Sequence, residues 1–111
     1  MSGFFLTSYG ASVIHDPNET ANYGLAWTNR LWPGATVVSA SWTVPVGVTN
    51  VNASINSTAL VYQGITYAAN TVSIIQLSGG TPGTRYTVTC RASMSNGEIL
   101  DQSFILDVRA K

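Results

Sequence analysis

The sequence predicts an all-β protein. No segment carries apolar residues at the i, i+3, i+4, i+7 spacing of an amphipathic helix over three turns, whereas alternation of apolar and polar residues is frequent. Ser, Thr and Asn supply 33 of the 111 residues, and threonine suits a half-buried strand better than a helix. These observations predict strands joined by turns.

The first predicted strands have clear boundaries. One places Tyr23, Leu25 and Trp27 on a single face and ends before the turn Trp32-Pro33-Gly34, where proline fixes φ and glycine accepts a positive φ. The next ends at Pro45, which has no N–H to donate to a sheet. Its apolar face is expected to consist of Val38, Ala40, Trp42 and Val44.

The later strands are separated by glycine-containing turns. Residues 79–83, with three glycines and a proline, form the main predicted corner, and Asn96-Gly97 predicts a hairpin with a type I′ turn. In the strand after the corner, Tyr86, Val88, Cys90 and Ala92 alternate inward. The predicted strands are residues 48–55, 60–65, 70–77, 85–93 and 99–109.

About seven short strands at this spacing predict a sandwich of two antiparallel sheets. Tyr86 lies at the start of the penultimate strand, where immunoglobulin-like and fibronectin III-like sandwiches place a tyrosine whose hydroxyl bonds back to the preceding corner. Trp42 is expected to pack in the core from mid-strand. We therefore expect an N-terminal extended arm over residues 1–15 and an immunoglobulin-like sandwich over residues 16–111.

The charge pattern excludes several classes of partner. Only 9% of residues are charged, against about 25% in an average domain, and five acidic and five basic side chains give zero net charge. Nucleic-acid binding needs a basic patch, and a membrane span needs about 20 consecutive apolar residues. Neither pattern is present in the sequence, so we expect partners that are proteins.

The sequence predicts no enzyme, no cofactor and no metal site. His15 is the single histidine, and Cys90 is the single cysteine and lies on an inward strand position, where a thiol is inert. The five carboxylates show no spacing that demands a shared site. Asp16 to Asn18 are predicted to form a turn, with a calcium site on Asp16, Asn18 and Glu19 as the alternative.

Apolar and aromatic residues outside the predicted core are candidates for a protein interface. Permanent interfaces are apolar and aromatic-rich at their centres, and zero net charge favours association, including association between copies of the chain. The candidate interface residues are Phe4, Phe5, Tyr9, Trp32, Tyr62 and Tyr67.

Four stretches occur in a characteristic order: DPNETANYGLAWTNRL (16–31), VVSASWTVP (37–45), the LSGGTPGTRYTVTC corner (77–90) and the closing SFILDVR strand. In these stretches the chain resembles the fibre-tail adaptor proteins, a family of small virion proteins of tailed bacteriophages. The resemblance covers nearly the whole length. It implies an immunoglobulin-like domain in the virion that ties fibres to the tail or neck by protein contacts and has no catalytic residues.

Two other functions stay open at this point. A protein of the same virion could instead decorate the capsid or connect head and tail. A small glycan-binding sandwich would use Trp32, Tyr62 or Tyr67 as stacking platforms for a sugar.

Overall fold

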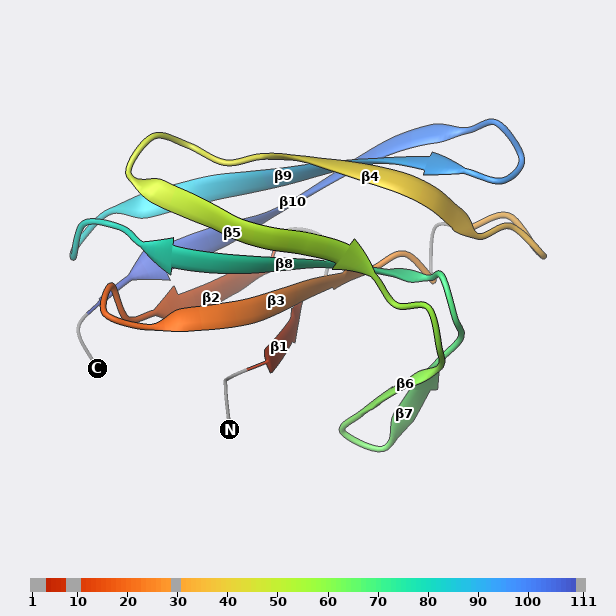
Figure 1. Ribbon diagram of the computed structural model, residues 1–111, viewed down its shortest axis with the longest axis horizontal. Helices are drawn as coiled ribbons and strands as arrows, with labels where there is room; N and C mark the ends of the chain where they lie inside the picture. The colour runs from red at the N-terminus through yellow and green to blue at the C-terminus, as the bar shows by residue number, and fades with distance from the viewer. Residues whose placement is uncertain (1–3, 8–10, 29–30, 110–111) are drawn as a thin grey trace.

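A computed structural model describes residues 4–7, 11–28 and 31–109, and within these residues the chain is all-β, without a helix (Figure 1). The alternation of apolar and polar residues identified most strands correctly. The strands are β1 (Phe4–Thr7), β2 (Ser12–His15), β3 (Thr20–Ala26), β4 (Val37–Thr43), β5 (Val48–Ile55), β6 (Leu60–Tyr62), β7 (Ile65–Tyr67), β8 (Val72–Gly79), β9 (Arg85–Met94) and β10 (Ile99–Val108).

Two four-stranded sheets form the body of the protein (Figure 1). The first sheet has the strand order β1-β3-β8-β5, and the second has the order β2-β10-β9-β4. The prediction of purely antiparallel sheets is wrong at the N-terminus, because β1 pairs parallel to β3 and β2 pairs parallel to β10. Residues 12–15, which the sequence analysis placed in the N-terminal arm, bury Val13 and His15 through this pairing.

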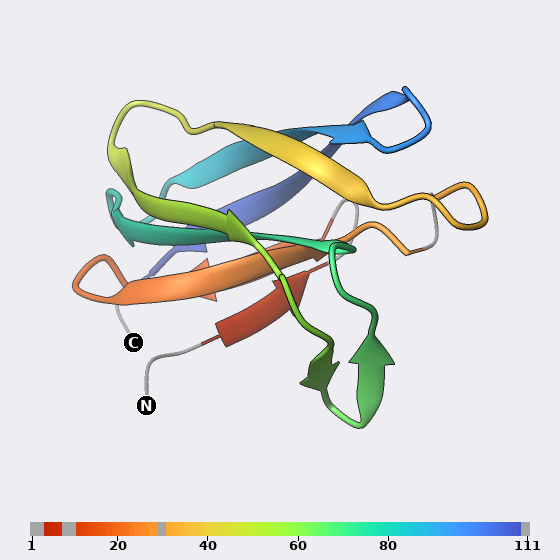
Figure 2. The same cartoon turned by 45° about the vertical axis from the view of Figure 1, so that its right-hand side comes forward.

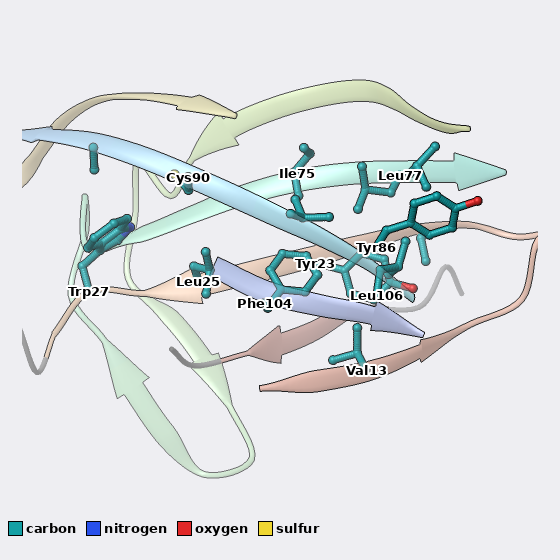
Figure 3. Close-up of a cluster of buried hydrophobic side chains, with 14 of the residues drawn as sticks. Val13, Tyr23, Leu25, Trp27, Ile75, Leu77, Tyr86, Cys90, Phe104 and Leu106 are labelled. Atoms are coloured by element: carbon teal, nitrogen blue, oxygen red, sulfur yellow. The ribbon is translucent and has the colours of Figure 1, made fainter. Parts of the chain in front are cut away.

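The hydrophobic core lies between the two sheets (Figure 3). The ring of Phe104 lies at its centre, with its centroid 5.8 Å from that of Tyr23 and 6.3 Å from that of Trp42. As the alternation predicted, most inward positions of β3, β8, β9 and β10 are buried, although Leu100 of β10 is only partly buried. The fully buried residues include Leu25, Ile75, Leu77, Val88, Cys90, Phe104 and Leu106.

At its N-terminal end, strand β4 directs a different set of side chains toward the core than the sequence predicts. A shift of register between Val37 and Ser39 marks a β-bulge against β9. A bulge adds one residue to a strand and so reverses the alternation on one side of it. Val37 is consequently buried and Val38 is 64% exposed, so the prediction that Val38 faces the core is wrong.

Two turns also differ from the prediction. Residues 60–65 are not one strand but β6 and the start of β7, with both turn residues, Gln63 and Gly64, at positive φ. This is the type I′ pattern. At the β9–β10 connection Gly97 has positive φ but Asn96 does not, and the Gly97 N–H donates to the Met94 carbonyl. The Met94 N–H also donates to the Glu98 carbonyl, so residues 95–97 form a three-residue connection with a glycine bulge and not the predicted type I′ turn.

The corner before β9 is held by Tyr86. The backbone N–H of Thr81 donates to the Tyr86 hydroxyl at 3.0 Å. Gly80, at a φ of +102°, lies so close to Val108 that a Cβ there would be 2.7 Å from a Val108 methyl group. Glycine is therefore required at this position by both conformation and space.

Candidate protein–protein interface

A hairpin of residues 60–67 extends away from the two sheets (Figure 2). It consists of β6 and β7, which form a separate two-stranded sheet. An isolated hairpin is marginally stable in water. We call it the projecting hairpin, and its conformation has to be maintained by the residues at its base.

Asn56 connects the projecting hairpin to the first sheet. Its Oδ1 accepts the backbone N–H groups of Thr71 at 3.0 Å and Val72 at 2.9 Å, and its Nδ2 donates to the carbonyls of Thr58 and Ala68. These four bonds use both amide hydrogens and both lone pairs of the carboxamide. The side chain is buried, so it fixes both ends of the hairpin to the start of β8.

One face of the projecting hairpin is apolar. The register pairs Leu60 with Tyr67 and Tyr62 with Ile65, and directly paired residues point to the same side of a ribbon. Of these four side chains, Ile65 is 56% exposed and the other three are half-buried. Val61, on the opposite face, is 67% exposed. The hairpin thus presents apolar groups on both faces.

The hairpin lies within a long segment that has no ionisable groups except tyrosines and carries no charge at neutral pH. Residues 31–84 contain no Asp, Glu, Lys, Arg or His, and they include β4 to β8. Among the described charged side chains outside this segment, two ion pairs are close: Arg91 Nε lies 2.9 Å from Asp101 Oδ1, and Arg109 Nη2 lies 3.0 Å from Asp107 Oδ2. An uncharged surface of this kind can be buried against a protein without desolvating an ion.

The structure brings together two of the predicted interface residues, Tyr62 and Tyr67, on the projecting hairpin. Trp32 lies on a different loop, where its carbonyl accepts the Ala35 N–H, and is 68% exposed. Phe4 and Phe5 belong to β1, opposite Asn22 and Tyr23 of β3. Tyr9 lies outside the described residues.

Three residues of this candidate interface were not among those predicted from the sequence. Val61 and Ile65 were predicted to lie in one continuous strand, and no structural role was predicted for Asn56. No local signal marks Asn56, because three of its four side-chain partners lie 12 to 16 residues away.

Two of the three tryptophans lie at contrasting depths in the body. Trp27 is fully buried, and its Nε1 donates to Ser73 Oγ at 2.9 Å. Trp42 is only partly buried and packs against the core from the edge strand β4.

Two reactive groups of the interior, the Cys90 thiol and the Tyr23 hydroxyl, are enclosed and stay protonated at neutral pH. Burial raises the pKa of the Cys90 thiol to about 11 and raises the pKa of Tyr23, whose hydroxyl lies 2.6 Å from His15 Nδ1. A thiol of this kind is a poor nucleophile at neutral pH.

Neither a metal centre nor a membrane-crossing helix is found in the described ranges. Those residues bring together no group of three or more His, Cys, Asp or Glu side chains that could hold a metal ion. Asp16 Oδ1 accepts the N–H of Asn18 at 2.8 Å, which is the geometry of a turn. The described part of the chain also has no helix long and apolar enough to cross a membrane.

Comparison with known proteins gives one assignment. A family model described as podophage GP4 fiber-tail adaptor protein gp77 matches residues 15–107. The chain belongs to this family. The match starts at His15 and ends at Asp107, so it covers the strands from β3 to β9, including the projecting hairpin, and most of β10. The family name indicates a structural role in the phage particle, which implies a location in the virion and contact with other virion proteins. No curated protein matches the chain.

Proposed function

We propose that this protein is a non-enzymatic adaptor that connects tail fibres to the tail or neck of a podophage through protein–protein contacts. The observation that carries this proposal is the projecting hairpin, an uncharged and apolar element that is fixed to the first sheet by four hydrogen bonds of Asn56. Because the hairpin is already fixed before it binds, less conformational entropy is lost when it contacts a partner. The membership in the adaptor family supports the same role.

We also infer that the body is an immunoglobulin-like sandwich. The support is the packing of two four-stranded sheets around one core and the hydrogen bond from the Thr81 N–H to the corner tyrosine, Tyr86. In this arrangement the sandwich is the rigid support, and the projecting hairpin contacts the partner. The N-terminal residues Phe4, Phe5 and Tyr9, together with Trp32, are proposed as further contacts with neighbouring virion proteins or with other copies of the chain.

A binding experiment with matched variants tests the adaptor role. The chain is immobilised, and the purified tail, neck, fibre and capsid subunits of the same phage are passed over it. Ile65→Lys places a charge on the projecting hairpin, whereas Ile99→Lys places the same charge at the start of β10, where Ile99 is 64% exposed. Burying an unpaired charge at an interface is strongly unfavourable.

We expect Ile65→Lys to weaken binding to a fibre or tail subunit by roughly 10- to 100-fold, which is about 1.4 to 2.8 kcal/mol, and Ile99→Lys to bind like the unaltered chain. Equal binding by both variants would refute a contact through the hairpin. Binding only to the capsid subunit would indicate a decoration protein, and binding only to the neck would indicate a head–tail connector.

A further inference from the structure

Over residues 39–43 the outer edge of β4 lacks the features that usually protect a sheet edge. β4 is the last strand of the second sheet, and β5 is the last strand of the first sheet. Natural edge strands avoid pairing with other chains by carrying charges, prolines or bulges. Residues 39–43 of β4 contain no charge and no proline, and the bulge of this strand lies before them. In β5 the register shift lies in mid-strand, between Asn50 and Asn52, so β4 has the more regular free edge.

A shallow groove of about 180 Å³ lies beside this edge, between β4 and β5. It is lined by Ala40, Trp42, Ala53, Ser54 and Ile55. Trp42 Nε1 is buried and has no hydrogen-bond partner among the described residues, although a buried indole N–H normally has one. A strand added beside β4 would cover this groove, because its inward side chains would lie opposite β5.

We propose that β4 pairs antiparallel with β4 of a second copy of the chain, across a two-fold axis at Ser41. This register places Trp42 opposite Ala40 of the other copy, so that a large side chain meets a small one on the inward face. On the outward face Ser39 lies opposite Thr43 of the other copy, and serine–threonine pairs are favourable across strands. In an edge strand every second residue directs its backbone N–H and C=O groups away from its own sheet. The proposed register pairs odd-numbered residues with odd-numbered ones and even-numbered with even-numbered ones, so these free backbone groups of the two copies lie opposite each other.

The absence of charge, together with the pairing of Trp42 with Ala40 and of Ser39 with Thr43, favours a second copy of the chain as the occupant of this edge. In a two-fold contact a residue on the axis meets the same residue of the other copy, so any charge there would meet a like charge. Residues 39–43 are uncharged. The nearest paired strand places Arg91 beside Ser41, and Asp101 binds Arg91 through two contacts of 2.9 and 3.2 Å. Zero net charge also leaves no general repulsion between copies.

The test is the oligomeric state of the full chain, measured by sedimentation velocity over a range of concentrations. Ser41→Lys and Ser41→Asp each place like charges on the proposed axis, and an equimolar mixture of the two variants places opposite charges there. Ser41 is exposed, so neither change disturbs the core. Thr49→Lys, at an exposed position of the β5 edge, is the matched control.

We expect the unaltered chain and the Thr49→Lys variant to dimerise with the same dissociation constant. Each Ser41 variant alone should raise that dissociation constant at least tenfold, and the equimolar mixture of the two variants should restore dimers. Dimers that are unaffected by Ser41→Lys would overturn the proposal. So would a chain that stays monomeric but loses binding to a fibre or tail subunit on Ser41→Lys, because a foreign strand would then occupy the edge. The Ile65→Lys binding result is independent of this test, so either proposal can fail alone.

Discussion

Replacing Asn56 with alanine should strongly destabilise the protein, although Asn56 lies in the connection that follows a strand, where most substitutions have small effects. The change leaves the N–H groups of Thr71 and Val72 without their acceptor, and both residues are buried. A buried donor that loses its partner costs about 1–3 kcal/mol, so the two together cost roughly 2–6 kcal/mol. The carbonyls of Thr58 and Ala68, which also lose a donor, are more accessible to water and add little.

We expect the free energy of unfolding to fall by about 3 kcal/mol, which is a large part of the 5–15 kcal/mol typical of a domain. Chemical denaturation of the Asn56→Ala variant measures this loss. Asn52→Ala is the control, because Asn52 is exposed on β5 and an exposed substitution changes stability by about 0.5 kcal/mol or less. Hydrogen exchange should show faster exchange of residues 60–67 in Asn56→Ala. A loss below about 1 kcal/mol would refute the reasoning that Asn56 fixes the hairpin.

Two further changes test the corner and the core. Tyr86→Phe removes the acceptor of the Thr81 N–H and should cost about 0.5–1.5 kcal/mol; an unchanged denaturation curve would contradict a structural role for this bond. The pKa of Cys90 is about 11 in the folded protein, against its ordinary value of 9.0 in the unfolded chain. The thiol therefore loses its proton at a lower pH in the unfolded state, so the free energy of unfolding should fall as the pH rises from 9 to 11. Denaturation of Cys90→Ala across this range should show a shallower decline, and an equal decline would contradict the burial of the thiol.

The faces of the central strands could be predicted because each has a single buried side. Alternation assigned Tyr23 and Leu25 of β3, and Val88 and Cys90 of β9, to the core, and all four are buried. Val38 was misassigned because two consecutive valines fit either facing, and the β-bulge that decides between them depends on pairing with β9. A bulge of this kind is set by tertiary contacts that no local pattern records.

The projecting hairpin shows why the candidate interface was only partly predictable. Asn-Gly is the usual sequence for a type I′ turn, yet it is Gln63 and Gly64 that adopt positive φ at both positions. Glutamine rarely takes this conformation, and here the Asn56 hydrogen bonds hold the ends of the hairpin together. Tyr62 and Tyr67 were predicted to be exposed aromatics, but the most exposed apolar side chains of the hairpin are Val61 and Ile65. The prediction of one continuous strand over residues 60–65 gave no indication of this.

A density map of the intact phage particle at residue resolution tests the central claim most directly. If the protein acts as an adaptor through the projecting hairpin, residues 60–67 should be buried against a fibre, tail or neck subunit in every copy, with the hairpin backbone unchanged from the isolated chain. Residues 60–67 exposed to solvent in every copy, with the fibre or tail attached elsewhere on the protein, would contradict it.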